Sequence, residues 1–251
     1  MTDIPRLLIL GGTGEAANLA ETAQTQFSGR LGVIYSMAGR TKPIRDFVTA
    51  VKVGGFGGGI GLADYIISEN IKILIDATHP FAKNISANAY DACLSTDTAR
   101  LSLTRPPWDL PPGTKFIEAD DMKHAALILS GFAKKVLVTT GQSNLNELKK
   151  LTDIRFFIRV MGKASEKATQ ENYTFIDGFP PFSLDEELAL IKKYDIDSLL
   201  TKQSGGTATV NKIIAAIRRR IPIVLIRRPP PEPGEHVESV EDALMWLEQK
   251  L

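Results

Sequence analysis

The fold is decided by the segment Leu7-Leu8-Ile9-Leu10-Gly11-Gly12-Thr13-Gly14-Glu15-Ala16-Ala17, in which an apolar run passes through glycines directly into a helical pattern. Within it, Gly12, Gly14 and Ala17 fit the G-x-G-x-x-G/A spacing. In that pattern the glycines allow a tight turn and close approach to a pyrophosphate, and the small third residue lets the helix pack on the strand. Amides at the start of the helix then face the phosphates. The segment predicts a dinucleotide-binding unit, with a glycine-rich turn that holds no ligand as the alternative.

The second predicted strand, Leu31 to Tyr35, indicates which dinucleotide is bound. An NAD site usually carries Asp or Glu about 20 residues beyond the glycines, for the ribose 2′-hydroxyl. Here the strand is followed by a hydroxyl, Ser36, and a guanidinium, Arg40. Because Arg pairs with phosphate through two parallel hydrogen bonds, this chemistry favours a 2′-phosphate and therefore NADP. The alternative is that Arg40 is an ordinary solvated side chain.

Composition sets the broad class of protein. The chain has 251 residues, 43% of them hydrophobic, which suffices for one large or two small domains. A formal net charge of +1 gives no support for nonspecific nucleic-acid binding. The single cysteine, Cys93, excludes an internal disulfide and a Cys-based metal site, and the three histidines are widely separated. With no bilayer-length apolar run and no secretory signal before the first strand, we expect a cytoplasmic protein without a metal, membrane or nucleic-acid partner.

Short apolar runs alternate with helical patterns, which is typical of parallel α/β sheets. In the first part we expect strands near 7–10, 31–35, 50–53, 72–76 and 100–104, with helices near 15–26, 41–48, 60–69 and 81–95. A break follows at 105–113, where four prolines in nine residues rule out a helix or a central strand. We interpret this break as a linker.

The second part repeats the alternation, with strands near 115–117, 135–139, 155–160, 197–201 and 222–226, and helices near 121–131, 143–150, 184–193, 207–219 and 239–249. Asp120 or Asp121 is suited to cap the first of these helices, and Ser239 the last. The proline-rich stretch 227–233 predicts a rigid extended connection. The predicted fold is α/β, with two doubly wound Rossmann-like units, residues 1–104 and 105–251, facing a shared cleft where the strands' carboxyl ends bind ligands.

Polar and glycine-rich segments follow several of the predicted strands. In the first unit these are Gly54–Gly59, suited to close approach of a ligand, and Asp76–Ala82, which contains His79. We expect His79 to contact a ligand or donate a proton, against the alternative of a structural histidine. In the second unit, Thr139-Thr140-Gly141 and Thr201–Thr207 precede helices. The latter combines amides, hydroxyls and an ammonium, which indicates anion binding, although a capped glycine turn is the alternative.

A set of segments resembles the precorrin-6A reductase family, in family order and across nearly the whole chain. It comprises Gly11-Gly12-Thr13-x-Glu15-Ala16, Ser36-x-Ala38-Gly39-Arg40, Gly54-Gly55-Phe56-Gly57-Gly58, Asp76-Ala77-Thr78-His79-Pro80-Phe81-Ala82, Arg105-Pro106-x-Trp108, Thr201-Lys202-x-Ser204-Gly205-Gly206 and Arg227-Arg228-Pro229-Pro230. The resemblance implies a reductase of cobalamin (vitamin B12) biosynthesis that uses NADPH to saturate one C=C bond of precorrin-6A, giving precorrin-6B. A sibling activity of the family acts on the cobalt-containing substrate.

The positions at the ends of predicted strands, Arg159 among them, and the resemblance together predict two sets of site residues. Cofactor contacts are expected from Gly11, Gly12, Thr13, Glu15, Ser36, Gly39, Arg40, Gly55 and Gly57. Substrate contacts are expected from His79, Arg105, Arg159, Lys202, Ser204, Gly205 and Arg227, whose cations suit the acetate and propionate groups of a tetrapyrrole. His79 is also the candidate catalytic residue, as an orienting group or as the proton donor.

Direct hydride transfer needs positioning of two rings more than a dedicated protein acid. A short-chain reductase is one alternative, although its Tyr-x-x-x-Lys pair is absent: Leu94, Asp177 and Ser198 follow Tyr90, Tyr173 and Tyr194 at that spacing. A noncatalytic NADP-binding sensor remains the alternative to an enzyme. The sequence leaves the oligomeric state open.

Overall fold

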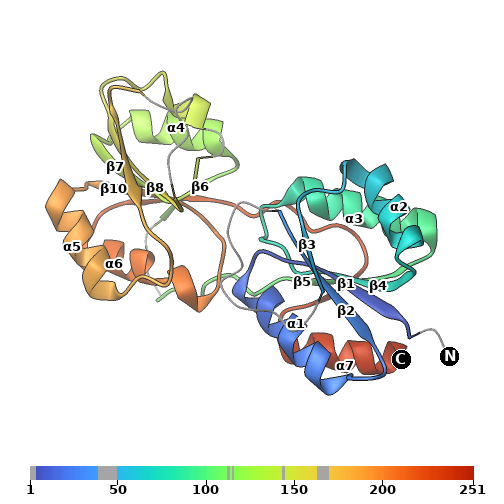
Figure 1. Ribbon diagram of the computed structural model, residues 1–251. Helices are drawn as coiled ribbons and strands as arrows, with labels where there is room; N and C mark the ends of the chain where they lie inside the picture. The colour runs from blue at the N-terminus through green and yellow to red at the C-terminus, as the bar shows by residue number, and fades with distance from the viewer. Residues whose placement is uncertain (1–3, 39–49, 112–113, 115, 143–144, 163–169) are drawn as a thin grey trace. The chain divides into compact units, whose positions relative to one another are not determined.

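The chain folds into two compact units, each built around its own six-stranded parallel sheet (Figure 1). The computed structural model describes residues 4–38, 50–111, 114, 116–142, 145–162 and 170–251. Unit 1 comprises Met1–Pro106 and Pro229–Leu251, and unit 2 comprises Pro107–Arg228. The structure thus confirms the predicted fold class of two doubly wound α/β units.

Unit 1 has the strand order β12-β5-β4-β1-β2-β3, which is the Rossmann order with β1 at its centre. The order reverses between β1 and β4, so ligand loops are expected at the carboxyl ends of these two strands. The strands are β1 (Arg6–Leu10), β2 (Gly32–Met37), β3 (Ala50–Val53), β4 (Ile71–Asp76), β5 (Ala99–Leu103) and β12 (Glu235–Val237), and the helices are α1 (Gly14–Gln26), α2 (Gly58–Ser68), α3 (Lys83–Thr96) and α7 (Val240–Lys250).

The central strand β1 is buried on both faces, which explains its uninterrupted apolar sequence. Leu7 and Ile9 pack into a cluster with side chains of α1 and α7. Leu8 and Leu10 point the other way, into a cluster with α2 and α3. Alternate residues of one strand therefore serve two separate helix layers.

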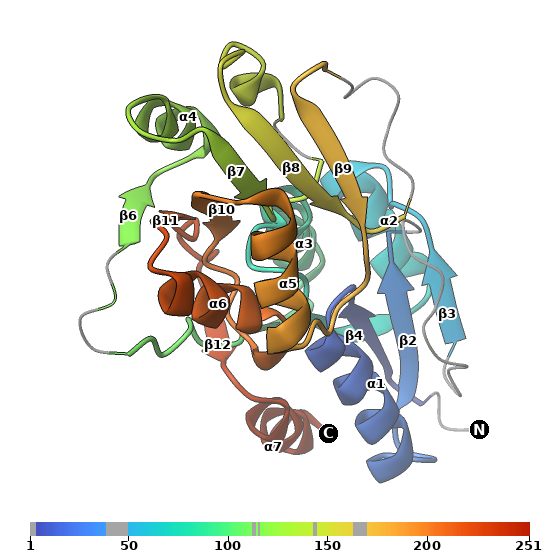
Figure 2. The ribbon, with the colours of Figure 1, turned by 90° about the vertical axis from the view of Figure 1, so that its left-hand side faces the viewer.

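Unit 2 has the strand order β6-β11-β10-β7-β8-β9, which reverses between β7 and β10. Figure 2 shows β7, β8 and β9 side by side, with α5 and α6 together on one face of this sheet. The strands are β6 (Phe116–Ala119), β7 (Lys135–Val138), β8 (Arg155–Val160), β9 (Tyr173–Asp177), β10 (Ser198–Lys202) and β11 (Ile223–Ile226), and the helices are α4 (Met122–Ser130), α5 (Leu184–Tyr194), α6 (Asn211–Arg219) and the 3-10 turns η1 (Leu145–Leu148) and η3 (Thr207–Thr209).

Most predicted elements appear within two or three residues of their expected bounds, and the remaining differences are local. Asp121 caps α4 and Ser239 caps α7, each accepting a hydrogen bond from a backbone amide of the first turn. The helix expected near 143–150 is described only as η1, and the one near 207–219 is split into η3 and α6. Strands β9 and β12 were not predicted, and the helix expected near 41–48 lies outside the described residues.

The domain boundaries require a correction at the C-terminal end. Residues 229–251, which the sequence placed in the second unit, belong to unit 1. The physical reason is that β12 pairs with the edge of the unit 1 sheet and α7 is buried against the unit 1 core. Strand β12 extends the unit 1 sheet beside β5, with His236 opposite Ser102, and Arg100 donates hydrogen bonds to Ser102 Oγ (3.0 Å) and to the Pro233 carbonyl. Helix α7 then buries Leu247 in the same core as α1. The chain therefore crosses between the units twice.

The helices of the described residues include none that is both long and apolar enough to cross a bilayer.

We expect Leu247→Ala to destabilise unit 1 by about 2–5 kcal/mol, because a fully buried leucine would leave a cavity between α7 and α1. Leu251→Ala is the matched control, since Leu251 is 39% exposed, and it should stay within about 0.5 kcal/mol of wild type. Urea unfolding measures the free energy of unfolding of both variants, and hydrogen exchange shows in which unit protection is lost. Loss of protection confined to unit 2 strands would contradict the assignment of this helix to unit 1.

Candidate functional site

The glycine-rich turn of unit 1 is tied to the neighbouring strand by Thr13. The Thr13 hydroxyl accepts a hydrogen bond from the Ala16 amide (3.1 Å), capping α1, and donates one to the Ala77 carbonyl (2.8 Å) just beyond β4. This hydroxyl joins the two loops at the point where the strand order reverses. The next amides, of Gly14 and Glu15, lie in the first helical turn, where no intrahelical acceptor exists. The turn can therefore present backbone donors to an anion.

Gly11 and Gly12 are required for different reasons. Gly12 has φ of +111°, a conformation that disfavours side chains, although an added Cβ would meet nothing within 4 Å. At Gly11 the limit is space, because a Cβ there would lie 2.3 Å from ring carbons of Tyr35. The Tyr35 hydroxyl also accepts a hydrogen bond from the Gly12 amide (3.0 Å). Sequence reasoning missed Tyr35, and its signal would have been a large side chain at the strand end facing a glycine.

The expected recognition of a 2′-phosphate is only partly within the described residues. Strand β2 continues to Met37, so Ser36 lies inside the strand rather than after it, and its side chain is buried. Its carbonyl accepts the Gly11 amide (2.8 Å), which fixes the start of the turn. Gly39 and Arg40 lie outside the described residues. The contact of Arg40 with a phosphate stays a prediction.

The glycine segment after β3 is held by Lys52, which sequence reasoning also missed. Lys52 Nζ donates to the carbonyls of Gly54 (3.2 Å) and Gly55 (3.0 Å) and lies 4.1 Å from the centre of the Phe56 ring. Gly57 then stands as the N-cap residue before α2, with φ of +83°. The carboxyl end of β3 lies at the same sheet edge as the glycine turn, because β2 and β3 are parallel. Gly55 and Gly57 are therefore at the correct edge for the expected cofactor contact.

The segment after β4 shapes the loop that carries His79. Asp76, which is buried, accepts hydrogen bonds from the Thr78 amide (3.1 Å) and hydroxyl (2.7 Å). His79 Nδ1 accepts a hydrogen bond from the Phe81 amide (3.2 Å). We assign the ring proton to Nε2 from this bond, since an acceptor Nδ1 carries none in the neutral ring. In this tautomer His79 is a hydrogen-bond donor through Nε2.

Two residues that were expected to bind different ligands form an ion pair within unit 1. Arg105 Nη1 lies 2.9 Å from Glu15 Oε2, and the two side chains are 17% and 33% exposed. Glu15 stands in the first turn of α1, directly after the glycine turn. This ion pair fastens Arg105 to the start of α1, and the expected contact of Arg105 with a substrate carboxylate stays a prediction.

In unit 2, the reversal of strand order brings Thr139-Thr140-Gly141 beside the segment after β10. Lys202 ends β10, and burial lowers the pKa of its ammonium below the usual value of 10.5. Gly205 and Gly206 both have positive φ, 65° and 77°. The Thr140 hydroxyl is buried and has no hydrogen-bond partner within the described part of the chain.

The loop after β10 is fastened from both inter-unit crossings. Trp108 Nε1 donates to the Gly206 carbonyl (2.7 Å), and Arg228 Nε donates to the Gln203 carbonyl (2.7 Å). The Ser204 amide donates to the Lys202 carbonyl (2.8 Å), which tightens the turn. The expected substrate residues Lys202, Ser204 and Gly205 therefore lie together in one constrained loop.

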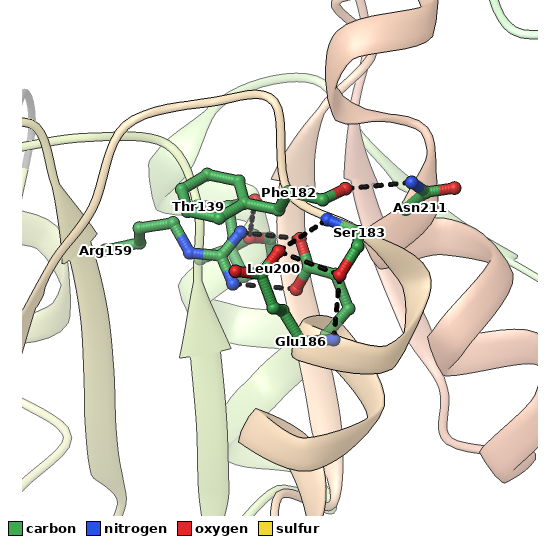
Figure 3. A network of polar contacts seen from close by, with 8 residues as sticks. Thr139, Arg159, Phe182, Ser183, Glu186, Leu200 and Asn211 are labelled. Atoms are coloured by element: carbon green, nitrogen blue, oxygen red, sulfur yellow. Dashed lines mark hydrogen bonds and ion pairs between the residues drawn. The ribbon is translucent and has the colours of Figure 1, made fainter.

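Two expected substrate cations of unit 2 pair with carboxylates in the structure, and their contacts with a substrate stay predictions. Figure 3 shows the Arg159 guanidinium against Glu186, Ser183 and the Phe182 ring at the start of α5. Its two terminal nitrogens bond both carboxylate oxygens of the buried Glu187, each at 2.7 Å, and the guanidinium carbon lies 4.1 Å from the centre of the Phe182 ring. Arg227 is half-exposed and pairs with Asp120. The structure gives both arginines partners within unit 2.

Comparisons with known proteins show which family has this sequence and this fold. A model of the family described as precorrin-6x reductase CbiJ/CobK matches residues 6–248. The precorrin-6A reductase of Rhodococcus erythropolis is 37% identical over 96% of this chain and 97% of its own, and that of Mycobacterium tuberculosis is 35% identical over the same shares. A solved structure titled CobK precorrin-6A reductase superposes with a TM-score of 0.89 at 30% identity, covering 98% of this chain and 97% of that one. The chain therefore belongs to the precorrin-6x reductase family.

Proposed function

We propose that this chain is a precorrin-6A reductase that uses NADPH to reduce one C=C bond of the macrocycle to give precorrin-6B. The observation that carries the proposal is the match across both units to precorrin-6A reductases, at 35–37% identity over 96% of the chain. Both reversals of strand order carry loops suited to anionic ligands, which supports a protein that binds an anionic cofactor and an anionic substrate.

The residues of unit 1 fit a nicotinamide dinucleotide. An added Cβ at Gly12 or Gly14 in the turn, or at Gly55 in the loop after β3, would meet none of the described atoms within 4 Å, which is compatible with close approach of a ligand. The amides of the first turn of α1 would hold the pyrophosphate, and Arg40 the 2′-phosphate. When bound, the cofactor supplies the hydride. The protein's own contribution is to fix the turn through Thr13 and to keep the site away from water.

The loop after β10 supports binding of substrate carboxylates in unit 2. Lys202 supplies an ammonium, and Ser204 and Gly205 supply a tight turn beside it. In unit 1, His79 follows β4 and its ring is held by the Phe81 amide, which supports a role in orienting the macrocycle, with proton donation as the alternative. A cleft shared by His79 and Lys202 remains the prediction made from the sequence.

The cobalt-containing substrate is the second candidate. The cobalt-precorrin-6A reductase of Methanothermobacter thermautotrophicus is 34% identical, but over 67% of this chain and 58% of its own. That of Methanocaldococcus jannaschii spans 96% of this chain at 25% identity. The higher identity over the full length favours the metal-free substrate.

The decisive experiment follows NADPH oxidation by the purified protein with precorrin-6A, and in parallel with cobalt-precorrin-6A. We expect oxidation with the metal-free substrate and a product heavier by two hydrogens in the mass spectrum. Faster turnover of the cobalt complex would favour the second candidate. NADPH binding without oxidation by either substrate would indicate a noncatalytic sensor.

We expect Arg40→Ala to weaken NADPH binding by about 1.5–3 kcal/mol while leaving NADH binding nearly unchanged, because only NADPH carries the 2′-phosphate. Isothermal titration calorimetry measures both affinities. Arg30→Ala is the control, since Arg30 is an exposed arginine paired with Glu248 at the far end of α1. Equal losses for the two cofactors would contradict the assignment.

We expect substrate affinity to fall as the pH rises through the pKa of Lys202, which burial places below 10.5. The charged ammonium attracts a carboxylate and the neutral amine does not, so the dissociation constant increases on the alkaline side. Lys202→Met should weaken binding about 10- to 100-fold near neutral pH. It should also remove the alkaline limb, which is the rise of the dissociation constant at high pH. Lys202→Arg should keep the charge and also lack the limb. Lys123→Met, at an exposed position of α4, is the control, and an alkaline limb that persists in Lys202→Met would contradict the role.

We expect Arg159→Met to destabilise the protein by about 3–5 kcal/mol, because Glu187 would remain as a buried, unpaired carboxylate. The double variant Arg159→Met/Glu187→Leu should recover most of this loss in urea unfolding. Substrate affinity of the folded protein should change little in either variant. If Arg159→Met kept wild-type stability and lost substrate affinity, Arg159 would be a substrate-binding residue, as the sequence predicts.

A further inference from the structure

We propose that Tyr35 is a positioning residue that holds the glycine turn of unit 1 in the conformation that binds the cofactor. The inference rests on the proposed function, because it assigns the turn to NADPH. Tyr35 lies near the end of β2 and stands opposite Ile9 of β1, two residues before Gly11. Its side chain belongs to the core cluster beneath α1 and is 2% exposed. Because its side chain is buried, Tyr35 acts on the ligand through the turn and not by direct contact.

The first contact between Tyr35 and the turn is steric. A Cβ at Gly11 would lie 2.3 Å from Cε2 and Cζ of the Tyr35 ring and 2.5 Å from its hydroxyl oxygen. Gly11 is not among the residues with positive φ, so its backbone alone would accept alanine. The ring is therefore what restricts this position to glycine.

The second contact is a hydrogen bond that sets the direction of one amide. The Tyr35 hydroxyl accepts a hydrogen bond from the Gly12 amide at 3.0 Å. In this orientation the Gly12 amide is bonded to the core, and the donors left for a pyrophosphate are those at the start of α1. Burial also raises the pKa of Tyr35 above its usual value of 10, so the phenol stays neutral through the pH range of an assay.

Among the described residues, Tyr35 supplies one of three hydrogen-bonded attachments of residues 11–13. The Gly11 amide donates to the Ser36 carbonyl (2.8 Å), and the Thr13 hydroxyl donates to the Ala77 carbonyl (2.8 Å). The attachment of Gly12 is the one that depends on a side-chain atom of β2. Removing that oxygen should loosen the middle of the turn and leave its two ends in place.

The test is Tyr35→Phe, which keeps the ring and removes the hydroxyl. We expect the dissociation constant for NADPH to rise about 3- to 10-fold, since one hydrogen bond that preorganises the turn is lost. The value of kcat at saturating NADPH should stay within about twofold, because Tyr35 does not touch the reacting atoms. In the protein without cofactor, the Gly12 amide should exchange with deuterium faster than in wild type.

Tyr173→Phe is the matched control. Tyr173 is also buried, and its hydroxyl donates to the Leu145 carbonyl at 3.0 Å in unit 2. We expect it to lose stability comparably while NADPH affinity and Gly12 exchange remain at wild-type values. An unchanged NADPH dissociation constant in Tyr35→Phe would overturn the proposal, and so would an equal rise in both variants.

A second pair of variants tests the steric contact. Gly11→Ala should weaken NADPH binding strongly in the wild-type background and much less in a Tyr35→Leu background, where the aromatic ring is absent. If Gly11→Ala weakened NADPH binding equally in both backgrounds, the proposed steric contact between Tyr35 and Gly11 would be overturned. Failure of wild-type protein to bind NADPH would instead contradict the proposed function, so the two failures are distinguishable.

Discussion

Both sheets consist of parallel strands, whose buried faces each require a layer of helices. In unit 1 this forces the chain to leave β1 toward α1 on one face and to leave β4 toward α3 on the other. The two connections diverge from adjacent strands, and the Thr13 hydroxyl fastens them by its bond to the Ala77 carbonyl. The loops that could hold a ligand are thus a direct consequence of how the apolar strands are covered.

The sequence was sufficient for strands that carry local apolar runs and insufficient for two edge strands, β9 and β12. Strand β1 has an uninterrupted apolar run and β4 contains the run Ile73–Ile75, so their positions follow from the local sequence. Strands β9 and β12 are sheet edges with only partial burial, and β12 has three residues. What makes β12 a strand is the free edge of β5, which lies more than 130 residues earlier in the chain. No local pattern contains that partner.

The candidate site divides in the same way. The motifs located the correct strand ends, because glycines, hydroxyls and charges after apolar runs are visible locally. The motifs did not show which arginines form ion pairs with which carboxylates. Arg105 and Glu15 are separated by 90 residues, and Arg159 and Glu187 by 28. An arginine in a sequence offers a cation, whereas its partner is decided by the fold. Lys202 ends the buried strand β10, and burial lowers its pKa.

The connection between the units is anchored beside both candidate ligand loops. Arg105 binds Glu15 at the start of α1, and only three residues later Trp108 binds the Gly206 carbonyl in unit 2. Two prolines, Pro106 and Pro107, lie between these anchors and fix φ at each position, which makes the segment stiff. Each anchor is local to its own unit, and neither is visible in the sequence, because the partner of Arg105 lies 90 residues away and that of Trp108 lies 98 residues away.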